Sequence, residues 1–303
     1  MSAGHKPAAE VHIDVPLVRR LLNAQFPQWA DLPIQPVDAS GWDNAIYRLG
    51  SDLAVRLPRR GMSAGQVEKE HQWLPMLVPV LPLAIPAPLG KGTPAEGYPW
   101  HWTVCRWLHG EIAAAAPLAD PGQAALDLAR FIKALRTVAT TNGPRNELRG
   151  VPLATRDQFT RADINSVRDR FDVTTVTAAW DAALAAPQWQ GPPVWFHGDL
   201  HPANLLVEDG QLTAVIDFGL LAVGDPACDV MAAWTVFSAD VRNVFRTALS
   251  VDDATWARGR GWALLLGLLM TAHSADNPVL DHIGQHTVNE VLADDEQQRP
   301  PCY

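Results

Sequence analysis

Short apolar runs separated by glycine, proline, asparagine or aspartate characterise the first third of the chain. Such runs predict β-strands, and the residues between them predict turns. Asp14 is placed to cap a helix that has Pro16 in its first turn and extends to about residue 25. Six prolines between residues 79 and 99 exclude a helix there. The predicted strands cover residues 34–40, 45–49, 53–57 and 102–108, with a helix over 64–77.

Apolar positions in the rest of the chain follow helical spacing. Ala125, Leu128, Ile132 and Leu135 form one stripe, which is typical of an amphipathic helix beginning near residue 122. Strands first and then helices around one β-hairpin predict an α+β fold with two lobes, residues 1–107 and 108–303. The further predicted helices cover 156–170, 176–185, 226–248, 253–273 and 278–293, and the strands among them cover 194–196, 205–207 and 212–216.

Chemistry is concentrated at this central hairpin. Residues 197–204 read His-Gly-Asp-Leu-His-Pro-Ala-Asn, and the returning strand leads to Asp217-Phe218-Gly219. Kinase-type phosphoryl transfer needs a carboxylate that receives the proton of the acceptor hydroxyl, together with oxygen ligands for Mg²⁺. We therefore expect Asp199 to be the catalytic base. Asn204 and Asp217 are the expected Mg²⁺ ligands, because the hairpin brings them back to one place.

One alternative uses the same residues. His197, Asp199 and His201 alternate, so on a strand they would face one side and could bind a transition metal. Pro202 disfavours a continued strand, and this alternative explains neither the asparagine nor the second aspartate. For His197 we favour a role in which its ring nitrogens tether the backbone of the loop.

Composition and charge narrow the function classes. The net charge of −9 disfavours nonspecific nucleic-acid binding and is compatible with a cationic substrate. The three cysteines form no C-x-x-C pair, the first ten residues lack the apolar core of a signal peptide, and the apolar run over 263–270 is too short to cross a membrane. We therefore expect a cytoplasmic protein with no membrane partner. Acidic residues near the end either attract a cation or are simply solvated: Asp281, Glu290, Asp294, Asp295 and Glu296.

The form His-Gly-Asp-Leu-His-Pro-x-Asn, followed by Gly-Asp-Pro-Ala-Cys-Asp at 224–229, resembles the aminoglycoside phosphotransferase family of kinase-like enzymes. This resemblance covers nearly the whole chain. It implies a bilobal protein-kinase-like fold, with a small antiparallel-sheet N-lobe that binds nucleotide and ends in a hinge, and a mainly helical C-lobe. It also implies that Asp229 braces the catalytic loop, although a helix N-cap would account for Asp229 equally well.

Nucleotide binding departs from the family pattern at two places. The family's phosphate-binding lysine falls at Arg56, which can still bind phosphate through its planar, permanently charged guanidinium. Its expected partner is Glu70, with Glu68 as a competitor and a solvated Glu70 as the simpler possibility. The expected nucleotide loop at Ser40 and Gly41 has only one glycine. In similar proteins the hinge binds the purine through its backbone, a role that falls here within residues 103–108, at Cys105 and Trp107.

Together these features predict an Mg²⁺-dependent kinase that transfers the γ-phosphate of ATP or GTP to a hydroxyl of an aminoglycoside-like or other antibiotic. Residues 54–60 resemble macrolide phosphotransferases, and the twelve tryptophans agree with a bulky acceptor. A kinase of the same fold that acts on choline, homoserine or a ketosamine is a further alternative. A catalytically inactive nucleotide-binding module is disfavoured, because Asp199, Asn204 and Asp217 are all present.

Overall fold

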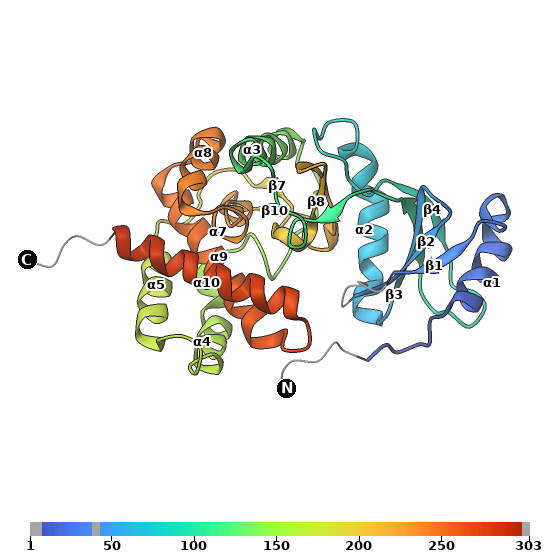
Figure 1. The fold of residues 1–303 in the computed structure, drawn as a ribbon, viewed down its shortest axis with the longest axis horizontal. Helices are drawn as coiled ribbons and strands as arrows, with labels where there is room; N and C mark the ends of the chain where they lie inside the picture. Colours follow the sequence, from blue (N-terminus) through green and yellow to red (C-terminus); the bar gives the residue numbers. More distant parts are fainter. Residues whose placement is uncertain (1–7, 38–42, 299–303) are drawn as a thin grey trace, which may run out of the picture. The chain divides into compact units, whose positions relative to one another are not determined.

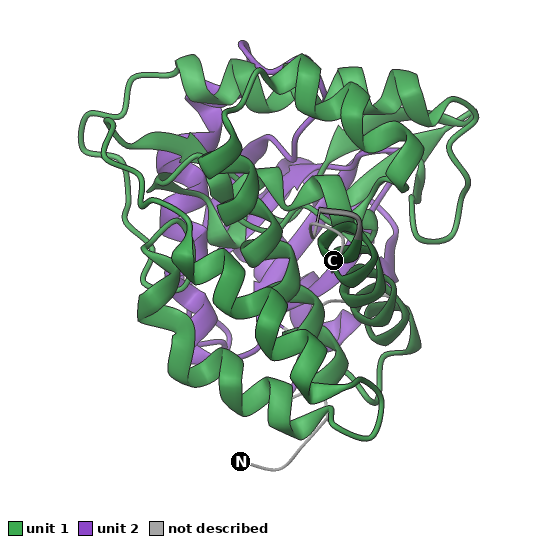
Figure 2. Ribbon diagram, turned by 90° about the vertical axis from the view of Figure 1, so that its left-hand side faces the viewer, with its two compact units in different colours: residues 1–5, 110–303 green, residues 6–109 purple. Residues whose placement is uncertain are grey.

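Antiparallel strands come first along the chain and helices follow. The computed structural model describes residues 8–37 and 43–298, which divide into an N-terminal unit (8–109) and a C-terminal unit (110–298). These are coloured purple and green in Figure 2. The predicted fold class, α+β with an antiparallel-sheet N-terminal part and a mainly helical C-terminal part, is confirmed.

The N-terminal unit contains one five-stranded antiparallel sheet in the order β1-β2-β3-β5-β4. Helices α1 and α2 accompany the strands (Figure 1). The Asp14 side chain accepts a hydrogen bond from the amide of Leu17 at 2.8 Å, as expected for the cap of α1. The elements are α1 (Val15–Gln25), the short helix η1 (Pro27–Trp29), β1 (Ile34–Pro36), β2 (Asn44–Leu49), β3 (Leu53–Pro58), α2 (Gly61–Leu77), β4 (Pro88–Gly92) and β5 (Trp102–Arg106).

Alternation along the strands separates the two faces of this sheet. Leu49, Val55 and Trp102 are fully buried and belong to the core cluster that also contains α1. Their neighbours along the strands point to the opposite face, because successive strand side chains alternate. Arg56 and Thr103 lie on that face, where their side chains contact residues of α2.

The C-terminal unit is organised around α9, a long helix that is apolar over most of its length. This helix is buried on nearly all sides, as the apolar run at 263–270 predicts. None of the helices in the part of the chain that the structure describes has the length and apolarity needed to cross a membrane. The elements are β6 (Glu111–Ile112), α3 (Pro121–Thr137), η2 (Leu153–Arg156), α4 (Asp157–Ser166), α5 (Val173–Ala185), β7 (Val194–Phe196), η3 (Pro202–Asn204), β8 (Leu205–Glu208), β9 (Gln211–Val215), η4 (Phe218–Leu220), β10 (Ala222–Gly224), α6 (Ala227–Val230), α7 (Ala232–Thr235), α8 (Ala239–Leu249), α9 (Asp253–His273) and α10 (Pro278–Gln298).

Four predicted elements are shorter or broken. The helix expected over 226–248 is three helices, α6, α7 and α8. Its break is stabilised from outside the local sequence, since the buried Arg242 donates from Nε to the carbonyl of Ala233 at 3.0 Å. The helix expected over 156–170 ends at Ser166, and the strand expected over 102–108 ends at Arg106. The strand expected over 34–40 ends at Pro36, with residues 38–40 outside the described part.

Two small sheets support the central loop of the C-terminal unit. Strand β7 pairs with β10, and β8 pairs with both β6 and β9, all antiparallel. The β8–β9 ladder begins with Leu205 opposite Val215 and contains one irregularity between Leu206 and Val207. The residues next to this ladder, Asn204 and Ile216, are joined by a further backbone hydrogen bond of 2.9 Å.

Candidate active site

His197 follows β7 directly and is fully buried. Its Nε2 lies 3.1 Å from the carbonyl oxygen of Ile216, and its Nδ1 lies 3.2 Å from the amide nitrogen of Asp199. Since a carbonyl can only accept and an amide can only donate, the proton is on Nε2 and the ring is neutral. Burial lowers the pKa of His197, in agreement with this state. The ring therefore tethers the loop backbone, and the transition-metal alternative is wrong because neither nitrogen is available.

Asp229 braces the same loop from α6. Its two carboxylate oxygens accept hydrogen bonds from the amides of His197 and Gly198, each at 2.8 Å, and the side chain is completely buried. Burial raises the pKa of Asp229, an effect that His197 and the two amides oppose. The bracing role is confirmed and the N-cap interpretation is wrong, because the carboxylate that bonds the first amide of α6 belongs to Asp225.

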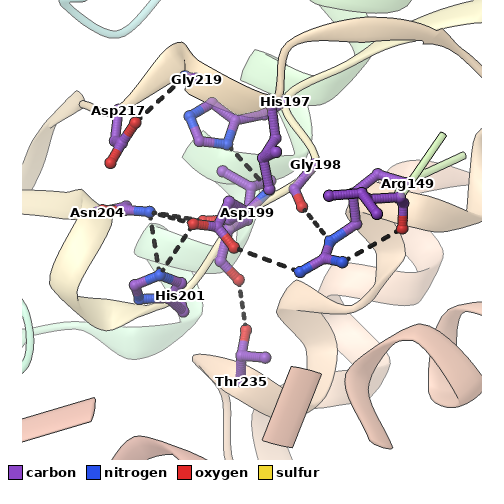
Figure 3. A network of polar contacts seen from close by, with 12 residues as sticks. Arg149, His197, Gly198, Asp199, His201, Asn204, Asp217, Gly219 and Thr235 are labelled. Carbon is purple, nitrogen blue, oxygen red and sulfur yellow. Dashed lines mark hydrogen bonds and ion pairs between the residues drawn. The ribbon is translucent and has the colours of Figure 1, made fainter. Parts of the chain in front are cut away.

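Asp199 lies at the centre of a polar network (Figure 3). One carboxylate oxygen accepts a hydrogen bond from Asn204 Nδ2 at 3.1 Å and lies 3.4 Å from His201 Nε2, and the other lies 4.0 Å from Arg149 Nη2. Burial alone would raise the pKa of Asp199, but His201 and then Arg149 and His197 lower it to about 2. The carboxylate is therefore ionised near neutral pH, and its side chain is 21% exposed, so an incoming hydroxyl could donate to it.

Asn204 and Asp217 flank the base of the hairpin, where the amide of Ile216 donates to the carbonyl of Asn204. Asn204 donates from Nδ2 to the backbone and side chain of Asp199. This fixes the amide nitrogen on one side and turns the carbonyl oxygen to the other. Asp217 is exposed and has a left-handed backbone with φ of 63°, and one of its oxygens accepts from the amide of Gly219 at 3.2 Å. A non-glycine residue in this region carries a conformational cost, which is common at functional sites.

This donor set fits a hard divalent cation. One amide oxygen and one carboxylate are the ligands that Mg²⁺ takes from proteins when water and phosphate oxygens complete its shell. Within the described ranges, no three or more histidine, cysteine, aspartate or glutamate side chains are grouped to hold a metal by themselves. The pair Asn204 and Asp217 therefore suits a cation that arrives with nucleotide phosphates, whereas a closed all-protein metal site would need more ligands.

A second polar pair lies in the N-terminal unit, on the α2 face of the sheet. Arg56 Nη1 lies 2.8 Å from Glu70 Oε2, and their side chains are only 12% and 4% exposed. The interpretation of Glu70 as a solvated residue is therefore wrong. Glu68 is not the partner, because it pairs with Lys91 and His101 instead.

Some backbone groups of the residues expected to bind the nucleotide base already pair with other residues of the N-terminal unit. Cys105 is buried in β5, a strand that pairs with a neighbour on each side, and burial raises the pKa of its thiol to about 11. The amide of Trp107 already donates to the carbonyl of Asp52 at 2.8 Å, so only its carbonyl could bond a purine. Ser40 and Gly41 lie outside the described residues, and the nucleotide-binding roles of all four stay predictions.

The family of this chain follows from a match to a family model. The model of the phosphotransferase enzyme family matches residues 34–262. The chain belongs to this family. The predicted recognition and enzyme class are thereby confirmed.

Solved structures agree on the fold of this phosphotransferase. The GDP and kanamycin complex of APH(2")-IIia is 21% identical over 92% of this chain and 99% of that chain, with a TM-score of 0.69. The macrolide 2'-phosphotransferase MphH from Brachybacterium faecium, an apoenzyme, is 22% identical over 91% and 98%, with a TM-score of 0.58. The gentamicin complex of APH(2")-IIa is 16% identical over 95% and 98%, with a TM-score of 0.60. No curated protein matches the chain.

The acidic residues near the end of the phosphotransferase do not form the solvated charge run that was one expectation. Most of them are paired with arginines from other parts of the C-terminal unit, and Asp295 is buried. They also offer less free negative charge to a cation than the sequence suggests. The pairs are Arg170–Asp281, Arg242–Glu290, Arg242–Asp294, Arg260–Asp294 and Arg260–Asp295.

Two side chains that contact the catalytic loop lie outside every motif recognised in the sequence. Thr235 donates from its hydroxyl to the carbonyl of Leu200 at 2.7 Å, and the buried Arg149 reaches both Gly198 and Asp199. Neither residue lies in a recognised motif, and Arg149 is about fifty residues away in the chain. The only local signal is an arginine in a stretch between helices, which more often indicates a solvated charge.

Proposed function

We propose that this phosphotransferase transfers the γ-phosphoryl group of ATP or GTP to a hydroxyl group of a small molecule, with Mg²⁺. One observation carries the proposal: a single hydrogen-bonded network holds an ionised, accessible Asp199 beside the amide of Asn204, and Asp217 follows the returning strand at the same open end of the hairpin. This arrangement supplies a proton acceptor and cation ligands together, which is the minimum that phosphoryl transfer requires.

The reaction balances with these groups. Asp199 accepts the proton of the acceptor hydroxyl while that oxygen bonds to the γ-phosphorus. The bond from this phosphorus to the bridging oxygen breaks, and the nucleoside diphosphate leaves. Asn204 and Asp217 would hold Mg²⁺, which neutralises charge on the phosphate oxygens when it is bound. The protein's work is mainly positioning and charge stabilisation.

Arg56 would bind nucleotide phosphate from the N-terminal unit. The ion pair with Glu70 at 2.8 Å restricts the guanidinium and fixes it on the α2 face of the sheet. Arginine suits this task because its fork of donors matches phosphate and its charge is permanent. We therefore expect that arginine in place of the family's lysine changes the geometry of phosphate binding but keeps the binding itself.

For the acceptor we propose an antibiotic hydroxyl, with an aminoglycoside first and a macrolide second. Support comes from the names of similar structures, which include kanamycin and gentamicin complexes and macrolide 2'-phosphotransferases. The pairing of the acidic residues near the end with arginines weakens the charge argument for a polycation, so macrolides belong in the first test.

Both free, buried cysteines described, Cys105 and Cys228, agree with a reducing cytoplasm.

The test is turnover with MgATP or MgGTP and a mixed panel of aminoglycosides, macrolides, choline, homoserine and ketosamines, read by mass spectrometry for addition of one phosphate. Asp199→Asn should lower kcat by about 10²- to 10⁴-fold, the usual contribution of a general base. Asp169→Ala, an exposed aspartate after α4, is the matched control and should match wild type. Unchanged turnover in Asp199→Asn would contradict the mechanism, and no phosphorylated product from any acceptor would contradict the proposed function.

A further inference from the structure

Arg149 is a buried arginine whose guanidinium faces the base-bearing loop. Its Nε donates to the carbonyl of Gly198 at 3.0 Å, and its Nη2 lies 4.0 Å from the Asp199 carboxylate. The side chain is only 5% exposed, and the guanidinium lies 6.0 Å above the ring of the buried Trp262. A side chain enclosed in this way has little freedom, so it can fix the position of the groups it contacts (Figure 3).

The segment that carries Arg149 is fastened to the strand after Asp217. Asn146 accepts the amides of Leu148 and Arg149 with its side-chain oxygen and donates from Nδ2 to the carbonyl of Leu220 at 3.2 Å. On either side of it, the carbonyls of Pro144 and Gly150 accept the amides of Val223 and Asp225, at 2.8 and 2.9 Å. Residues 144–150 are therefore anchored to 220–225 and reach 198–199 through one side chain.

The two oxygens of Asp199 are held from opposite directions. Asn204 and His201 face one oxygen, and Arg149 faces the other. Without the guanidinium, the carboxylate would be held on one side only, and the buried carbonyl of Gly198 would lose its donor. Both changes would let the Asp199 side chain rotate away from the acceptor hydroxyl.

We propose that Arg149 is a positioning residue for Asp199: its guanidinium locks the Gly198 carbonyl and the base carboxylate, and so sets the angle at which the acceptor hydroxyl is met. This inference rests on the proposed function for its kinetic test. The structural test of Arg149 does not depend on the proposed function, because the orientation of Asp199 can be observed without turnover.

The decisive comparison uses a second buried arginine with the same kind of contact. Arg242 also donates from Nε to a backbone carbonyl, that of Ala233, at 3.0 Å, and its side chain contacts Glu290, Asp294 and the ring of Trp234. Arg149→Met and Arg242→Met both remove a buried guanidinium, so both should lower stability in urea unfolding. Only Arg149→Met should lower kcat, by about 10- to 100-fold, since small misplacement of a reacting group costs that much. Its KM for nucleotide should stay near wild type.

Two further variants separate charge from geometry. Arg149→Lys keeps the charge but cannot reach the Gly198 carbonyl and Asp199 at once, so its kcat should lie between wild type and Arg149→Met. Arg145→Gln changes an exposed arginine of the same segment and should behave as wild type.

The result that overturns the proposal is equal loss of kcat in Arg149→Met and Arg242→Met, or a wild-type kcat in Arg149→Met. A crystal structure of Arg149→Met gives the independent outcome. We expect a rotated Asp199 side chain, and an unmoved one would overturn the proposal. If wild type phosphorylates nothing in the panel, the proposed function fails while this structural result still decides the role of Arg149.

Discussion

Replacing Asp229 with alanine should remove the hydrogen bonds that hold the catalytic loop to α6 and so lower the stability of the protein. The carboxylate of Asp229 satisfies two buried backbone donors, the amides of His197 and Gly198, at 2.8 Å each. All three residues are buried, so water cannot easily replace the lost acceptors. An unsatisfied buried donor costs about 1–3 kcal/mol. Two such donors predict a loss of about 2–6 kcal/mol.

This loss is large against the whole stability of a domain, which is about 5–15 kcal/mol. The assay is urea unfolding of wild type and Asp229→Ala, followed by fluorescence from the buried tryptophans. Asp169→Ala, an exposed aspartate in the same unit, should change the free energy of unfolding by less than about 0.5 kcal/mol. A loss below about 1 kcal/mol in Asp229→Ala would refute the reasoning, because it would mean that neither amide depends on this carboxylate.

Two further predictions concern backbone strain and pH. Gly198 has φ of +87°, and a Cβ there would lie 3.1 Å from the Phe196 ring, so Gly198→Ala should cost about 1–3 kcal/mol in thermal unfolding; an unchanged Tm would contradict this. Asp281 is hydrogen-bonded by Arg170, which lowers its pKa in the folded state. Its contribution, less than about 1 kcal/mol for this partly exposed pair, is therefore full above the ordinary aspartate pKa of about 4 and is lost as the pH falls through the folded value. The difference in unfolding free energy between wild type and Asp281→Asn should shrink from pH 7 to pH 3, and a constant difference would disprove the linkage.

The sequence places three candidate site residues at one hairpin because they are close in the chain. Asp199, Asn204 and Asp217 lie within one loop and one hairpin, so strand periodicity and a turn suffice to bring them together. The buried pair of Arg56 and Glu70 was also predicted, although only through the family resemblance, since an exposed glutamate fits the local pattern equally well.

Other features depend on contacts that no local pattern contains. The break between α7 and α8 is stabilised by Arg242, whose guanidinium supplies the donor that a continuous helix would have provided. The choice between brace and cap for Asp229 depends on which amides approach it. Those amides belong to His197 and Gly198, about thirty residues earlier in the chain, and only tertiary structure brings them to α6. Arg149 was missed because a charged residue between helices is usually solvated, and only tertiary packing encloses it.

The lengths of β8 and β9 set the relative positions of the two candidate Mg²⁺ ligands at the end of this hairpin. Asn204 comes directly before β8 and Asp217 comes two residues after β9, so both lie at the open end of the ladder, beside the pair Leu205 and Val215. A residue added within either strand would shift one ligand past the other by a strand repeat and turn it to the opposite face. A residue added at the tip, near Asp209 and Gly210, would leave the open end of the ladder untouched. We therefore expect natural variation in length to concentrate at the tip, with the spacing between each ligand and its strand held constant.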